Sequence, residues 1–369
     1  MKKSRFVALS LLLVFSIVTL VSGCASPASQ STPEAPAAET AAAPPATPAA
    51  SEADFSHLKV ALISDPIGTE QFILQAYHKV EEMAGIHGFQ WTSMECGDTA
   101  QWEENGRAAA NEGYDLVIGV GWQAAEPFSA LADEFDHVHY AVIDAIAGND
   151  KVTSIGFNET EGCYVLGVMI GTAFPDEALY GYVGSFQTQA TYKYRYGFSE
   201  GVKSVNPDAE FMYNYTNSYS DTSLPYEYTT QQQAAGATFI FGGVAASANA
   251  GIYQAALDLA ERGTPIYTTG LSVDQTTPDN PYIIGGALKN TGSCTEIIIS
   301  QYLDGTLAGG AQILGLKEDA FGVVHVTTDT ANYMNEEMMP PEAIDAAKAV
   351  AAKIIAGELE IIAPEESAN

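Results

Sequence analysis

The chain has 369 residues and carries 15 Lys and Arg against 46 Asp and Glu, which gives a formal net charge of −31. Nucleic acid repels so acidic a chain, so the charge excludes nucleic acid as a partner. The 4 cysteines and 6 histidines show no spacing typical of metal ligands. We therefore expect no metal and no cofactor.

A bacterial lipoprotein signal is predicted at the N-terminus. Basic residues at positions 2, 3 and 5 precede an apolar run that ends in Leu20-Val21-Ser22-Gly23-Cys24. Such a signal, here residues 1–23, is removed and the thiol of Cys24 is acylated. Two acyl chains give stable anchoring, so we expect an extracytoplasmic protein that only its lipid holds on the cell membrane. An ordinary secreted signal with an incidental cysteine is the alternative.

A disordered linker is expected over residues 24–56, because Ala, Pro, Ser and Thr dominate there and cannot form a core. About 310 residues remain, which is enough for two lobes rather than one core. They include Cys96, Cys163 and Cys294. This odd number permits at most one disulfide, whose pairing the sequence does not determine.

Beyond the linker, strands alternate with helices. We expect strands at 59–64, 115–120, 138–143, 178–183, 211–215, 238–241, 266–269 and 282–284. We expect helices at 69–85, 124–135, 192–205, 251–262, 294–303 and 341–355. This alternation is typical of βαβ units and predicts an α/β protein with two doubly wound lobes and a ligand cleft between them.

Ligands of open parallel sheets bind outside the carboxyl ends of the strands, so the loops there are the candidate site. Three aromatic residues lie in or near such loops: Phe72, Trp122 and Phe186. Each is able to stack on a planar ring. A core position is the alternative for Phe72, whereas Trp122 follows a strand end where a large aromatic has little packing reason to be.

Three charged residues also follow predicted strands. Lys289 is able to donate to ligand hydroxyls or to a carboxylate, and a structural salt bridge is its alternative role. Asp144 and Asp65 are able to accept from ligand hydroxyls, or alternatively to cap the turns in which they lie.

These segments together resemble the basic membrane protein family of ABC-transporter substrate-binding lipoproteins, which includes purine-nucleoside receptors. The resemblance covers residues 59–362 and rests on a colinear series of matches. They are the strand before Asp65 with Phe72, residues 115–122 and 140–144, the segment from Ser154 to Gly167, residues 198–207, residues 219–221, residues 251–256, residues 270–275, Lys289-Asn290 and residues 355–358.

The resemblance implies a type I periplasmic-binding-protein fold without enzymatic activity. It places the first lobe at 58–157 plus 272–318 and the second at 158–271 plus 319–363. It also implies two partners, a small-molecule ligand and an ABC permease, and we expect a monomer.

The resemblance adds Asp221, Ser272 and Asp274 to the candidate ligand residues. The chain departs from nucleoside-binding members at two positions: Ile73 replaces a base-reading Asn, and Ser272 replaces a ribose-binding Asp. A site built around buried polar partners rejects ligands that leave them unpaired. The two departures argue against a purine nucleoside in particular, so the expected ligand is a nucleoside or a related small polar ring compound.

Two other functions fit parts of the sequence. A tethered sensor that hands its closed form to a signalling receptor would use the same lobes. Residues 197–201 match the G-x-S-x-G motif of α/β-hydrolases, with Ser199 as nucleophile and His325 downstream. No strand precedes this motif, so we expect Ser199 inside a helix and no hydrolase activity.

Overall fold

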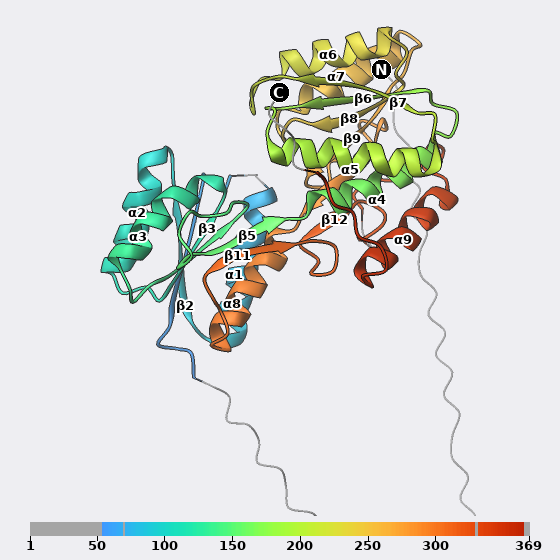
Figure 1. Cartoon of the computed structure of the whole chain (residues 1–369). Coiled ribbons are helices and arrows are strands. Elements are labelled where there is room, and N and C mark those ends of the chain that lie inside the picture. The colour runs from blue at the N-terminus through green and yellow to red at the C-terminus, as the bar shows by residue number, and fades with distance from the viewer. Residues whose placement is uncertain (1–53, 69–70, 329–330, 365–369) are drawn as a thin grey trace, which may run out of the picture. The chain divides into compact units, whose positions relative to one another are not determined.

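Two six-stranded sheets organise the protein, and each forms the centre of one lobe (Figure 1). The computed structural model describes residues 54–68, 71–328 and 331–364. The predicted signal, Cys24 and most of the predicted linker lie outside the described residues. None of the described helices is long and apolar enough to cross a bilayer.

The sheet of the first lobe is entirely parallel and has the order β11-β5-β4-β3-β1-β2. Its strands are β1 (Lys59–Ser64), β2 (Gln90–Glu95), β3 (Leu116–Val120), β4 (His139–Ile143), β5 (Thr153–Phe157) and β11 (Gly310–Leu314). The helices of this lobe are α1 (Gln71–His87), α2 (Thr99–Asn111), the short 3₁₀ helix η1 (Trp122–Ala124), α3 (Ala125–Glu134) and α8 (Thr291–Leu303).

Successive side chains of β1 belong alternately to two core clusters, which shows that helices cover both faces of this sheet. Val60 and Leu62 belong to the core cluster that includes α1 and α8. Ala61 and Ile63 belong to a second cluster, which includes Trp102 of α2 and residues of α3. Because successive side chains of a strand point to opposite faces, a fully apolar strand requires helices on both sides.

The second lobe has the sheet order β12-β10-β9-β8-β6-β7, in which only β12 is antiparallel to its neighbour. Its strands are β6 (Leu179–Gly184), β7 (Glu210–Tyr215), β8 (Phe239–Gly243), β9 (Tyr267–Ser272), β10 (Ile283–Lys289) and β12 (Phe321–Val323). Its helices are α4 (Glu159–Ala173), α5 (Gln189–Val205), α6 (Ser223–Ala234), α7 (Ala250–Glu261) and α9 (Pro341–Ile355). Figure 1 shows α6 and α7 on one face of this sheet and α5 on the other. The two sheets confirm the predicted α/β fold class.

Helices α4 and α5 pack with their backbones in close approach. A Cβ added to Gly167 would lie 2.2 Å from the carbonyl oxygen of Phe198, and one added to Gly201 would lie 2.1 Å from that of Tyr164. Ser199 lies inside α5, and its Oγ donates to the carbonyl of Tyr196 at 3.1 Å. The G-x-S-x-G match is therefore a helix-packing feature and not a strand-to-helix elbow.

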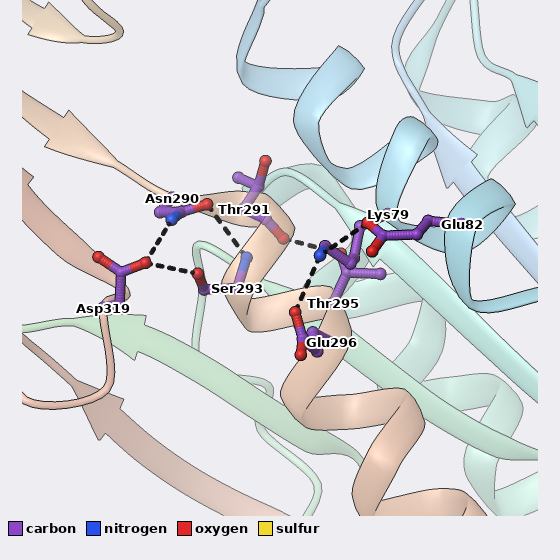
Figure 2. Close-up of polar contacts among 8 residues, drawn as sticks. All are labelled: Lys79, Glu82, Asn290, Thr291, Ser293, Thr295, Glu296 and Asp319. Carbon is purple, nitrogen blue, oxygen red and sulfur yellow. Dashed lines mark hydrogen bonds and ion pairs between the residues drawn. The ribbon is translucent and has the colours of Figure 1, made fainter. Parts of the chain in front are cut away.

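The chain crosses between the two sheets three times: after β5, after β10 and after β11. Hydrogen bonds join these crossings, with Asn158 N donating to Leu314 O and Asn290 N donating to Ala320 O, both at 2.8 Å. Figure 2 shows that the Asn290 side chain also donates to Asp319, at 3.1 Å, and accepts from the amide of Ser293 at the start of α8.

One predicted lobe boundary is wrong. The resemblance predicts residues 272–318 in the first lobe, but β10 pairs with β9 in the second sheet. The crossing therefore lies at Asn290 rather than near Ser272, because no helix separates β9 from β10 and the two strands pair directly in parallel. Cys96, Cys163 and Cys294 are buried and unpaired, so none of them forms a disulfide.

Candidate functional site

A cavity of about 510 Å³ is lined by residues of both lobes. Its walls come from the carboxyl ends of strands in both sheets, as parallel sheets lead one to expect. Five predicted ligand residues are in its lining: Phe72, Trp122, Asp144, Ser272 and Lys289. The lining also contains residues that the sequence analysis did not single out, among them Glu159, Ser185, Lys193, Tyr194 and Tyr219.

The ammonium of Lys289 joins the two lobes at the base of this site. Its Nζ donates to Oδ1 of Asp144 at 2.5 Å and lies 3.9 Å from Oε1 of Glu159. It also lies 4.9 Å from the ring centroid of Phe157. Burial by itself lowers the pKa of Lys289, but the neighbouring acidic groups, first Asp144, raise it well above its usual value. Lys289 is therefore positively charged, and β10 of one lobe is held to the loop after β4 of the other.

Glu159 is the second carboxylate of this cluster and opens helix α4. Its residue is 6% exposed. The nearest charge to its Oε2 is Nζ of Lys193, at 3.8 Å, which is too long for a hydrogen bond. Burial raises the pKa of Glu159, although Lys289 and Lys193 oppose this shift. Its position in the first turn of the helix favours a negative charge there.

Two cavity residues adopt left-handed backbone conformations that non-glycine residues rarely populate. Asp144 has φ of 79° and Ser272 has φ of 68°. Each directly follows or ends a strand, β4 and β9 respectively. Such strained backbone conformations persist only where the surrounding structure maintains them, and they are concentrated at ligand-binding sites.

Large apolar side chains that line the cavity are exposed to solvent. Trp122 is 61% exposed, Ile313 52% and Ile146 48%, all in the first lobe. Tyr219 of the second lobe is 50% exposed, and its ring lies 4.8 Å from that of Phe186. Phe186 itself is outside the lining and contacts the cavity only through Tyr219.

Three predicted aspartates lie outside the lining and hold loops. Asp65 accepts from Nε2 of Gln123 at 2.7 Å, and burial raises its pKa. Asp221 accepts from the first backbone amides of α6. Asp274 accepts from Thr276 and from the amide of Asn332 at 2.7 Å. The bonds of Asp221 and Asp274 to Ser223, Leu224 and Thr276 cap their own turns, whereas Asp65 contacts a side chain 58 residues away rather than the turn in which it lies.

Glu159 was missed because no strand was assigned before it. The resemblance covers this segment, from Ser154 to Gly167, but it does not single out Glu159. With β5 recognised, the rule would have pointed to the residues directly after Phe157, and so to Glu159.

Most of the chain is similar to known proteins. A family model described as "ABC transporter substrate-binding protein PnrA-like" (Bmp) matches residues 60–364. The chain is 24% identical to the "CD4+ T-cell-stimulating antigen" of Listeria monocytogenes, over 88% of this chain and 91% of that protein. It is 22% identical to the "ABC transporter nucleoside-binding protein BmpA" of Lactococcus lactis, over 84% and 87% respectively.

A solved solute-binding protein of an ABC transporter system from Aeropyrum pernix K1 has the same fold. The TM-score is 0.68 at 23% identity, over 84% of this chain and 94% of that one. The family model and the Lactococcus lactis relative describe binding proteins of ABC transporters rather than enzymes, which confirms the expectation that this chain is not an enzyme. The chain belongs to the Bmp family of PnrA-like substrate-binding proteins of ABC transporters.

Proposed function

We propose that this protein is the extracytoplasmic, membrane-anchored receptor of an ABC importer, and that it captures a nucleoside or a related small polar ring compound. The observation that carries the proposal is the charged cluster of Asp144, Glu159 and Lys289, which lies in a cavity lined by both lobes. The relative named as nucleoside-binding and the predicted signal ending at Cys24 support it.

The size and lining of the cavity suit such a ligand. Its volume of about 510 Å³ lies within the range of small-molecule sites. Aromatic side chains such as Phe72 and Trp122 offer faces for a planar ring, and the charged cluster offers partners for hydroxyl groups.

Capture follows from the two-lobed architecture. A ligand that contacts both lobes binds their closed arrangement more tightly and shifts the open–closed equilibrium toward it. The three crossings, tied together at Asn158, Asn290 and Asp319, are the expected hinge. The closed form would then dock on the permease and release the ligand to it.

Isothermal titration calorimetry of the purified protein tests the ligand class. The panel consists of nucleosides, nucleobases, sugars and amino acids, at concentrations up to the millimolar range. Micromolar affinity for a nucleoside supports the proposal. Binding of an amino acid alone would keep the receptor role and overturn the ligand class.

Metabolic labelling with radioactive palmitate tests the anchor. We expect label in the wild type and none in Cys24→Ala, which should be released from the membrane fraction. Wild-type protein that carries no palmitate label and is found in the culture medium would contradict the lipid anchor at Cys24. The proposal about the ligand would be unaffected.

A further inference from the structure

The lobes offer the ligand different chemistry. The first lobe contributes Trp122, Ile146 and Ile313, large apolar side chains whose exposure costs free energy until something covers them. The second lobe contributes Ser185, Thr188, Thr191, Lys193 and Ser247, together with Glu159. A ligand held between these walls meets large apolar side chains on the first lobe, and on the second it meets these polar groups beside apolar residues such as Tyr219 and Val244.

Two buried polar atoms in the second-lobe wall have no hydrogen-bond partner among the described residues: Oε2 of Glu159 and Oγ of Ser185. Glu159 is 6% exposed and Ser185 is 1% exposed. A buried polar atom without a partner costs about 1–3 kcal/mol, and more when the group is charged. Such atoms in the wall of a binding cavity are satisfied when a ligand supplies the missing partner.

The charges of the described lining show which partner is missing. Asp144 already accepts from Lys289, and the two lysines of the lining each lie within 4 Å of a carboxylate oxygen, at 2.5 Å and 3.8 Å. The carboxylates and the lysines balance in number, so no spare positive charge faces the cavity. The unsatisfied atom of Glu159 is an acceptor, which a ligand N–H or O–H satisfies and a ligand anion repels.

We propose that Glu159 recognises a hydrogen-bond donor on the ligand, so that the cavity selects an uncharged ring compound with its N–H or O–H groups on the second lobe and its apolar face on the first. This inference rests on the proposed receptor function and specifies the ligand and the residue that selects it. A ligand without the donor leaves a buried carboxylate oxygen without a hydrogen bond, which is a strong basis for rejection.

A double-mutant cycle between protein and ligand tests this role. Wild type and Glu159→Gln are titrated calorimetrically with inosine, its 2′-, 3′- and 5′-deoxy analogues, inosine 5′-monophosphate, ribose and myo-inositol. We expect an uncharged compound to bind most tightly, and Glu159→Gln to weaken it by about tenfold or more. Removing one particular hydroxyl or N–H from the ligand should weaken its binding to the wild type by a similar factor. The same removal should leave its affinity for Glu159→Gln almost unchanged.

Two further variants keep the test decisive. Glu161→Gln removes another carboxylate from the same helix, one that does not line the cavity, and should bind as the wild type does. Glu159→Asp keeps the charge but shortens its reach, so it should lose affinity even if Glu159→Gln fails to fold.

The outcomes separate the two proposals. Equal affinity of the wild type and both Glu159 variants would overturn this inference while the receptor function stands, as would tightest binding of the monophosphate. An equal loss for every ligand would mean that Glu159 only positions Lys289, which also overturns it. A wild type that binds no compound of this panel or of the broader one would refute the proposed function, and this inference with it.

Discussion

The two lobes share a doubly wound sheet but differ in how their side chains meet the cavity. In the first lobe, the apolar residues Trp122, Ile146 and Ile313 are about half exposed or more. In the second, Glu159, Ser185 and Lys289 are buried although they are polar. Exposed apolar groups gain when a ligand covers them, and buried polar groups gain when a ligand pairs with them. The same architecture thus supplies affinity from one side and selectivity from the other.

The difference extends to helix packing. In the second lobe, glycines bring the backbones of α4 and α5 together, whereas in the first lobe Gly106 of α2 faces side chains of α3. Backbone-to-backbone contact tolerates no added atom, while side chains are able to move aside. The second lobe is therefore expected to be the more sensitive of the two to small substitutions.

The largest effect is expected where the lobes are joined. Lys289→Met leaves the buried carboxylate of Glu159 and the partly buried carboxylate of Asp144 without their shared cation. Breaking a buried ion pair from one side costs about 3 kcal/mol of the free energy of unfolding. Urea denaturation followed by circular dichroism measures it. The control, Lys193→Met, removes a more exposed lysine at 3.8 Å from Glu159 and should cost less; equal costs would contradict the joining role of Lys289.

The next effect concerns the helix pairs. Gly167→Ala places a methyl group 2.2 Å from the carbonyl oxygen of Phe198, whereas Gly106→Ala places one 2.7 Å from Cδ1 of Leu131, a flexible side-chain end. We expect Gly167→Ala to cost roughly 2 kcal/mol and Gly106→Ala to cost less. Thermal unfolding of the two variants in the same buffer compares them. A larger loss for Gly106→Ala would reverse the proposed contrast between the lobes.

A smaller effect is expected on the apolar wall. Trp122→Ala should weaken the tightest ligand of the nucleoside panel about tenfold, or ~1.4 kcal/mol, because it removes an exposed aromatic face. Its melting temperature should remain that of the wild type, since Trp122 is 61% exposed. Ile86→Ala is the matched control, because Ile86 is 67% exposed and outside the cavity lining. Lower stability with unchanged affinity would mean that Trp122 is a packing residue.

The smallest effect is a pH dependence on the polar wall. Burial raises the pKa of Glu159, so the carboxyl group of Glu159 binds its proton more tightly in the folded protein than in the unfolded chain. The resulting stabilisation is present below the ordinary Glu pKa and is lost as the pH rises through the raised one. Glu159→Gln lacks this titration, so its melting temperature should rise relative to the wild type between pH 4 and pH 8. If the melting temperature of Glu159→Gln minus that of the wild type is constant or falls between pH 4 and pH 8, the raised pKa of Glu159 is contradicted.

Local patterns predicted some apolar elements to the residue, although the apolar helix α4 and the buried strand β5 were not predicted. The boundaries predicted for β1 and α9, at 59–64 and 341–355, are those of the structure. Strand β2 and helix α2 were missed, because β2 is a half-exposed edge strand without an apolar run and α2 is mostly polar and alanine. A weak amphipathic pattern does not distinguish such elements from loops.

The sequence by itself determined the alternation of strands and helices, and with it the edges of the sheets at which ligand residues gather. It did not distinguish Asp65 from Asp144, since both follow buried apolar strands. Only the tertiary structure placed Asp144 against Lys289, 145 residues away, and Asp65 against Gln123. The order of strands in a sheet depends on contacts between distant segments, and the periodicity of a single segment carries no record of them.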